Sequence, residues 1–134
     1  MAEKENTGHT LAGLHVYTLD EKQKKIKKVL KKLKGIFELM PDDNKTLSES
    51  LLKNVAFMQV ELTELEQIIM IKGSVEEYKN GANQTGYKQS SAVQAYNSLL
   101  KSYNSSLRLL LSQLPEGEAK SAAKDKLAAF LMGD

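Results

Sequence analysis

The stretch LLKNVAFMQVELTELEQIIMIK, residues 51–72, carries an apolar seam that decides the fold of this chain. Its seam residues alternate between spacings of four and three: Leu51, Val55, Met58, Leu62, Leu65 and Ile69. That pattern predicts an α-helix with a heptad seam, and apolar residues off the seam indicate more than one neighbouring element. We expect the helix to begin with a capping box at Thr46–Glu49 and to end at Gly73, where positive φ carries no steric penalty.

A second seam with the same period follows in residues 91–114 and stops at Pro115. Its members are Val93, Tyr96, Leu100, Tyr103, Leu107, Leu110 and Leu114. We expect this helix to be capped by Ser91. Two seamed helices of similar length, joined by a compact connector, should pack antiparallel as a helical hairpin covering residues 46–115.

The connector, residues 73–90, is polar and contains EEYKNGANQTGYKQSS, whose last residue is Ser91. Asn80-Gly81 is the strongest short hairpin signal, because a type I′ turn needs positive φ at both central residues. That turn would pair Lys79 with Ala82 and Glu77 with Gln84. A flexible polar loop without regular structure is the alternative interpretation. Since a two-stranded ribbon is marginal alone, we expect it to pack on the helices or, preferably, on a neighbouring subunit.

Residues 18–45 are expected to form a basic amphipathic helix, between a flexible arm at 1–17 and a C-terminal helix or tail at 116–134. Thr18 and Glu21 fit a capping box. An apolar stripe follows, and it predicts a helix that runs through Gly35 to Met40 and is ended by Pro41. The stripe residues are Ile26, Val29, Leu30, Leu33, Phe37 and Met40.

Lysines occupy the rest of this helix: Lys22, Lys24, Lys25, Lys27, Lys28, Lys31, Lys32 and Lys34. Residues 1–35 hold nine basic and four acidic residues, whereas residues 36–134 hold ten and thirteen. This asymmetry favours a polyanion contact, in which ammonium groups neutralise phosphates without reading sequence. A solvated helix face and a membrane-surface helix are the alternatives. Arg108 is the only arginine, which argues against bidentate reading of guanine edges.

Composition narrows the class of protein. A chain of 134 residues predicts one domain, and the absence of cysteine excludes a disulfide framework and a thiolate zinc site. No apolar run is long enough for a membrane span, so we expect an intracellular protein. His9 and His15 lack ligand partners at metal-binding spacing, and Glu61, Glu64 and Glu66 are interpreted as a solvated face. With no phosphate-binding loop, we expect no enzyme, cofactor or metal.

The stretch from residue 47 to 117 resembles the terminase small subunits of tailed double-stranded-DNA phages. The similar features occur in order: an LxxNVAFM-like helix, a glycine, the pattern E-x-x-NG-x-x-x-x-G-x-K-x-S, a helix containing AYN, and an LLPxE-like end. The upstream run IFELMPDDNKTLSESLL is also similar. The chain departs from better-known members in having no evident N-terminal helix-turn-helix.

The resemblance implies a packaging subunit that oligomerises, commonly as a ring, and binds viral DNA in the host cytoplasm. Its partners would be double-stranded DNA, the large terminase subunit that carries the ATPase and nuclease, and further copies of itself, with no membrane. The lysines would contact DNA, both seams would form the oligomer core, and the C-terminal segment would be a candidate contact for the large subunit. A non-enzymatic helical adaptor or assembly protein that binds partner helices is the alternative.

Overall fold

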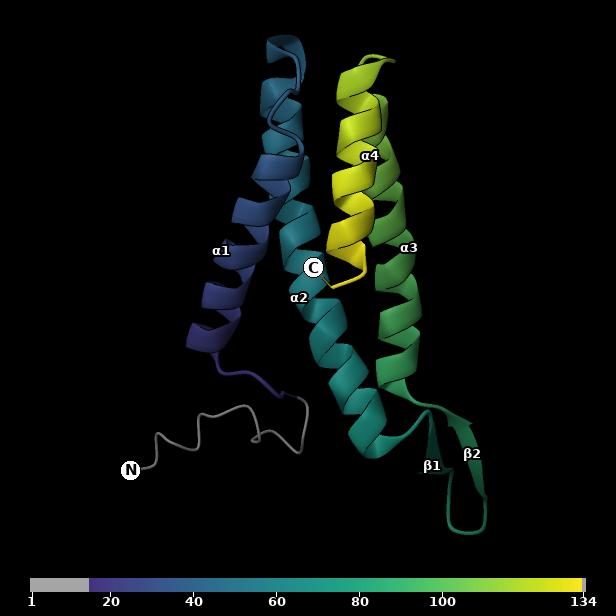
Figure 1. The fold of residues 1–134 in the computed structure, drawn as a ribbon. Coiled ribbons are helices and arrows are strands. Elements are labelled where there is room, and N and C mark those ends of the chain that lie inside the picture. The colour runs from purple at the N-terminus through teal and green to yellow at the C-terminus, as the bar shows by residue number, and fades with distance from the viewer. Residues whose placement is uncertain (1–14, 134) are drawn as a thin grey trace.

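The computed structural model describes residues 15–133, which are mainly helical with a small two-stranded antiparallel sheet (Figure 1). Most of the predicted arm, including His9, lies outside the described residues. The elements in chain order are α1 (Leu19–Ile36), a 3-10 turn η3 (Asp42–Asn44), α2 (Lys45–Lys72), β1 (Val75–Lys79), β2 (Thr85–Gln89), α3 (Ser91–Ser112) and α4 (Glu118–Leu131).

The predicted antiparallel helical hairpin is confirmed, since α2 and α3 pack side by side along most of their length (Figure 1). α1 lies along α2, and α4 folds back along α3 and also touches α1. The four helices therefore enclose one core. The mainly helical class with a short β-hairpin connector is as predicted, while the oligomeric state stays a prediction.

The centres of both seams are buried within a single chain. Six of the predicted oligomer-interface residues are buried: Val55, Met58, Leu62, Tyr103, Leu107 and Leu110. The other six are partly buried: Leu51, Leu65, Ile69, Val93, Tyr96 and Leu100. The buried six lie in a core that also contains Leu33 of α1 and Leu127 of α4. The seams hold the monomer together, so an oligomer would have to use other surfaces or the partly buried ends of the seams.

The capping box at the start of α1 is confirmed. The Glu21 N–H donates to Thr18 Oγ1 at 3.1 Å, and the Thr18 N–H donates to Glu21 Oε1 at 2.9 Å. The predicted end at Met40 is wrong, because α1 stops at Ile36 and Phe37 leaves helical geometry with φ −106° and ψ 26°. Pro41 explains the early end: its ring would clash with the Phe37 carbonyl and disfavours a helical Met40.

Two predicted helix starts are wrong by a short distance. η3 runs directly into α2, so Thr46 lies inside the first turn and caps nothing, while the Ser48 hydroxyl donates to the Asn44 carbonyl at 2.6 Å. At α3 the cap is Ser90, whose hydroxyl accepts from the Val93 N–H at 3.2 Å. Ser90 is still extended because its own N–H bonds the Ser74 carbonyl, and extended geometry is what a cap residue needs.

Thr18→Ala should lower the free energy of unfolding by about 1 kcal/mol, since it removes the side-chain cap of α1. The measurement is urea denaturation followed by circular dichroism. Thr46→Ala is the matched control and should change stability by less than about 0.5 kcal/mol, because exposed Thr46 makes no cap. Equal losses in the two variants would contradict the assigned caps.

The predicted β-hairpin is present, but its two-residue turn is wrong. β1 pairs with β2 so that Lys79 faces Thr85 rather than Ala82, and the Asn80 N–H closes the loop on the Gln84 carbonyl at 2.7 Å. Gly81 does have positive φ, 82°. The predicted register also paired Glu77 with Gln84, whereas the structure pairs Glu77 with Tyr87.

Side-chain pairing explains the observed register. It places the Tyr78 ring against Gly86, where a Cβ would lie 3.0 Å from the ring. It also pairs Glu76 with Lys88, with 3.6 Å between Oε2 and Nζ. The predicted register would have set Tyr78 opposite Asn83 and left Glu76 without a cation. Cross-strand pairs of this kind stabilise a register by about 0.2–1 kcal/mol each.

Candidate nucleic-acid interface

The outward side of α1 carries a row of lysines opposite its buried side. Lys24, Lys27, Lys28 and Lys31 follow the spacing i, i+3, i+4, i+7 and are all exposed; we call them the lysine row. Leu33, on the opposite side of the helix, is fully buried. The row extends over roughly 10 Å of helix, at about 1.5 Å per residue. It can therefore present several ammonium groups to one surface.

The lysine row is almost free of competing carboxylates. Within residues 15–133, Lys27, Lys28 and Lys31 have no ion-pair partner. Lys24 pairs with Asp20 at 3.2 Å, but both side chains are about three-quarters exposed. Exposed pairs of this kind contribute little, so Lys24 can exchange Asp20 for another anion.

The remaining lysines of the predicted DNA site are less uniform. Lys25 lies over the Tyr17 ring, with Nζ 4.6 Å from the ring centroid. Lys32 lines a groove between α1 and α4, and Lys34 lines one between α1 and the start of α2. Lys22 is withdrawn from the surface, because its Nζ contacts Glu61 Oε2 at 2.5 Å and Glu64 Oε1 at 2.8 Å. Seven of the eight lysines are thus exposed, and four of them form the row.

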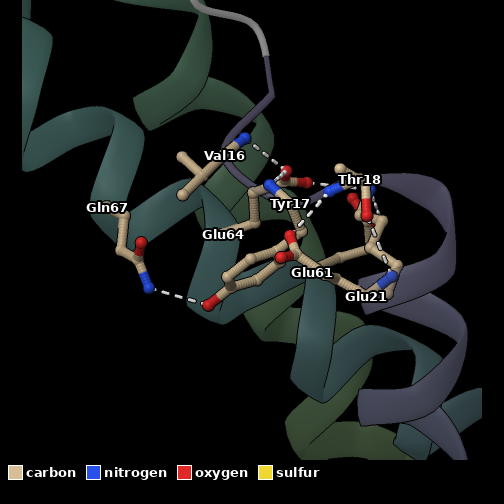
Figure 2. Close-up of polar contacts among 8 residues, drawn as sticks. Val16, Tyr17, Thr18, Glu21, Glu61, Glu64 and Gln67 are labelled. Carbon is tan, nitrogen blue, oxygen red and sulfur yellow. Dashed lines mark hydrogen bonds and ion pairs between the residues drawn. The ribbon is translucent and has the colours of Figure 1, made fainter. Parts of the chain in front are cut away.

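Glu64 of α2 holds Lys22 of α1 and the residues just before α1 in place (Figure 2). Glu64 is 3% exposed, and Oε2 of its carboxylate accepts backbone N–H groups from Val16 at 2.7 Å and Tyr17 at 2.9 Å. Gln67, one turn further along α2, donates to the Tyr17 hydroxyl at 2.7 Å. These hydrogen bonds fix the two residues before the cap of α1 against α2. Val16 and Tyr17, the last residues before the predicted helix at 18–45, are therefore packed against α2.

Burial and pairing act in opposite directions on this ion pair. Burial alone would raise the pKa of Glu64, but the Lys22 ammonium and the two backbone N–H groups outweigh it and hold the pKa below the ordinary value. Burial alone would lower the pKa of Lys22, but Glu61 and Glu64 outweigh it and raise that pKa. Both groups are charged at neutral pH, and a buried carboxylate needs such partners.

The prediction that Glu64 lies on a solvated face is wrong. The available signal was its position between Val60 and Ile68, four residues away on each side. All three residues are buried. The segment before α1 contacts Glu64, α1 lies beside Val60, and the start of the β-ribbon and of α3 lies beside Ile68. A glutamate in such a line, with a lysine-rich helix to pack against, indicates a buried ion pair rather than solvent.

Across residues 15–133, no group of three or more histidine, aspartate or glutamate side chains is placed to hold a metal ion. None of the helices in this range is long and apolar enough to cross a membrane. Comparisons with protein-family models, curated proteins and solved structures gave no match to this chain.

Proposed function

We propose that this protein is a DNA-packaging recognition subunit that binds double-stranded viral DNA through the lysine row. The observation that carries the proposal is the row itself: Lys24, Lys27, Lys28 and Lys31 are exposed together on a helix that Glu64 anchors to the core. Four ammonium groups on one face neutralise several phosphates and release their counterions. The resemblance of residues 47–117 to terminase small subunits supplies the biological setting.

The proposed binding mode is contact with the phosphate backbone. Lysine is a point charge on a flexible stem, whereas base edges are commonly read by planar or bidentate groups. In this role the protein assembles as a homo-oligomer, commonly a ring, in the cytoplasm of the infected host. The large terminase subunit supplies the ATPase and nuclease, so this subunit needs no catalytic group or cofactor of its own.

Replacing Lys24, Lys27, Lys28 and Lys31 together by Gln should weaken DNA binding strongly. A plot of log K against log salt has a negative slope, and each lost phosphate contact reduces its magnitude by ~0.9. Losing four contacts should therefore reduce the magnitude by up to about 3.6. Fluorescence anisotropy of a labelled duplex over a salt series measures both affinity and slope. Circular dichroism verifies that the variant keeps its helices.

The matched control removes four exposed lysines from other helices: Lys53, Lys101, Lys124 and Lys126. It changes net charge by the same amount, so a purely non-specific attraction would weaken equally in both variants. We expect the control to retain most of the affinity and slope. Unchanged binding in the lysine-row variant would refute the proposed contact.

A helical adaptor is the second candidate, and one groove favours it. Ile36 of α1 and Ala129 and Phe130 of α4 line an open groove of about 500 Å³, with Lys32 and Lys126 also lining it. An apolar groove edged by charge suits a partner helix. An adaptor should show no DNA affinity near physiological salt, so the same anisotropy experiment separates the two candidates.

A further inference from the structure

The β1–β2 ribbon projects beyond the ends of α2 and α3 and is largely uncovered (Figure 1). Tyr87, at the middle of β2, is 75% exposed, and Val75, at the start of β1, is 57% exposed. An isolated two-stranded ribbon is marginally stable in water. Exposed strands with large apolar side chains are also templates for pairing with another chain.

The hydrogen bonds at the two ends of the ribbon show which backbone groups face outward. The Ser90 N–H bonds the Ser74 carbonyl at 2.8 Å, and the Asn80 N–H bonds the Gln84 carbonyl at 2.7 Å. In an antiparallel ladder, such bonded pairs alternate with non-bonded pairs whose N–H and C=O groups point to the outer edge. The register therefore turns these groups outward at the odd-numbered residues Val75, Glu77, Lys79, Thr85, Tyr87 and Gln89.

Charge distinguishes the ways in which two ribbons could join. β1 carries two adjacent acids, Glu76 and Glu77, and one cation, Lys79, at its end, whereas β2 carries Lys88 and no acid. Pairing β1 with β1 about its centre would place Glu77 opposite the same residue of the second copy, and like charges directly opposite are destabilising. Pairing β2 with β2 gains no charge pair. Pairing β2 with β1 sets a cation against acids.

We propose that β2 of one copy pairs antiparallel with β1 of the next copy, in the same register as within the chain. The inference rests on the oligomerisation that the proposed function requires, and it names the interface. Lys88 then faces Glu76 of the next copy, and Gly86 faces Tyr78 of the next copy. The contact is head-to-tail, and repeated contacts of this kind form a ring when the rotation between successive copies closes.

The hydrogen-bonding pattern between copies alternates with the pattern within each chain. Odd-numbered residues exchange hydrogen bonds between copies, and even-numbered residues form the non-bonded pairs, whose Cα atoms lie only about 4.5 Å apart. Lys88 and Glu76 are even-numbered, so their interchain pair falls where cross-strand side chains are closest. Each interior strand then has both backbone edges hydrogen-bonded.

The native chain contains no cysteine, so single cysteines can test the register. A tagged Lys79→Cys chain, co-refolded with untagged Thr85→Cys, should form mixed disulfides under mild oxidation, because these positions face each other at about 5.5 Å between Cα atoms. Lys79→Cys with Gln89→Cys is the matched control. Its cysteines lie four residues out of register, roughly 13 Å apart, and should not join. Equal yields from both mixtures, or none from the first, would overturn the proposed pairing.

Charge exchange between chains separates interchain pairing from intrachain pairing. Glu76→Lys and Lys88→Glu should each lose the oligomer in size-exclusion chromatography with light scattering, whereas an equimolar co-refolded mixture should recover it. In the mixture, alternating chains restore opposite charges at every interface, although the pair within each chain stays repulsive. Glu76 also accepts from the Ser91 N–H at 3.3 Å, so circular dichroism checks each fold. A mixture that remains dissociated would overturn the inference, as would an undiminished oligomer in either variant alone.

The two proposals fail in different ways. If the oligomer binds DNA but the Lys79→Cys and Thr85→Cys chains form no mixed disulfide, the proposed function is intact and this interface is refuted. A native chain that stays monomeric at micromolar concentration refutes the interface and counts against the packaging role as well. Loss of DNA binding in the lysine-row variant with disulfides unchanged shows that the ribbon and the DNA contact are separate surfaces.

Discussion

Glu64→Ala is expected to lower the free energy of unfolding by about 3–5 kcal/mol, the range for breaking a buried ion pair from one side. The substitution leaves Lys22, whose side chain is 19% exposed, with Glu61 alone. It also strips the Val16 and Tyr17 N–H groups of their acceptor. Unsatisfied donors in a partly buried setting add to the cost. Chemical denaturation at pH 7 measures the loss.

The stability difference between native protein and Glu64→Ala should depend on pH in one direction. The folded-state pKa of Glu64 is held below its ordinary value of 4.5, so the folded state prefers the charged carboxylate. Its contribution is complete above pH 4.5 and is lost as pH falls through the lower folded-state pKa. The difference should therefore be constant from about pH 5.5 to 7 and shrink on further acidification.

Glu49→Ala is the matched control, since Glu49 is an exposed carboxylate on the same helix. It should cost less than about 0.5 kcal/mol at pH 7, because an exposed side chain is removed. If Glu64→Ala were equally mild, Glu64 could not anchor α1. A secondary consequence concerns DNA: a loosened α1 holds the lysine row less firmly, so affinity should fall although no lysine is changed.

The helices were predictable because each carries strong and redundant local signals. The seam of α2 repeats over several turns, and Thr18 with Glu21 encodes a capping box in four consecutive residues. Gly73 and Pro115 mark ends where helical geometry is blocked or positive φ is required. The small error at the start of α3 reflects a choice between two adjacent hydroxyl residues, Ser90 and Ser91, that only three-dimensional geometry decides. At the start of α2, η3 runs directly into the helix and no side chain caps it.

The missed features depend on residues far apart in the sequence. Lys22 and Glu64 are separated by more than forty residues. The positions of Val60 and Ile68 around Glu64 indicate that Glu64 is buried, but no local pattern identifies Lys22 as its partner. The ribbon register depended on Tyr78 covering Gly86 and on Glu76 facing Lys88, whereas the Asn80-Gly81 signal encodes only a local turn preference. Cross-strand contacts outweighed that preference, which is the usual way tertiary structure overrides a local signal.

Leu110→Ala is expected to lower the free energy of unfolding by about 3–5 kcal/mol, because it removes a fully buried side chain and leaves a cavity. Leu110 lies where α3 faces the rest of the core, among α1, α2 and α4 residues. Leu109→Ala is the matched control. Leu109 is 42% exposed, so removing its side chain opens no cavity. Thermal and urea denaturation of both variants measure the difference.

The same pair of variants separates an intramolecular seam from an oligomer seam. If Leu110 stabilises the monomer core, as its burial within one chain requires, the loss in Leu110→Ala is independent of protein concentration. If it acted mainly between copies, the variant would be a well-folded monomer whose deficit disappears at high concentration by mass action. We expect the first result. It would assign the central seams to the fold. Assembly would then require another surface, and the ribbon that we propose for it has mostly exposed side chains and open strand edges.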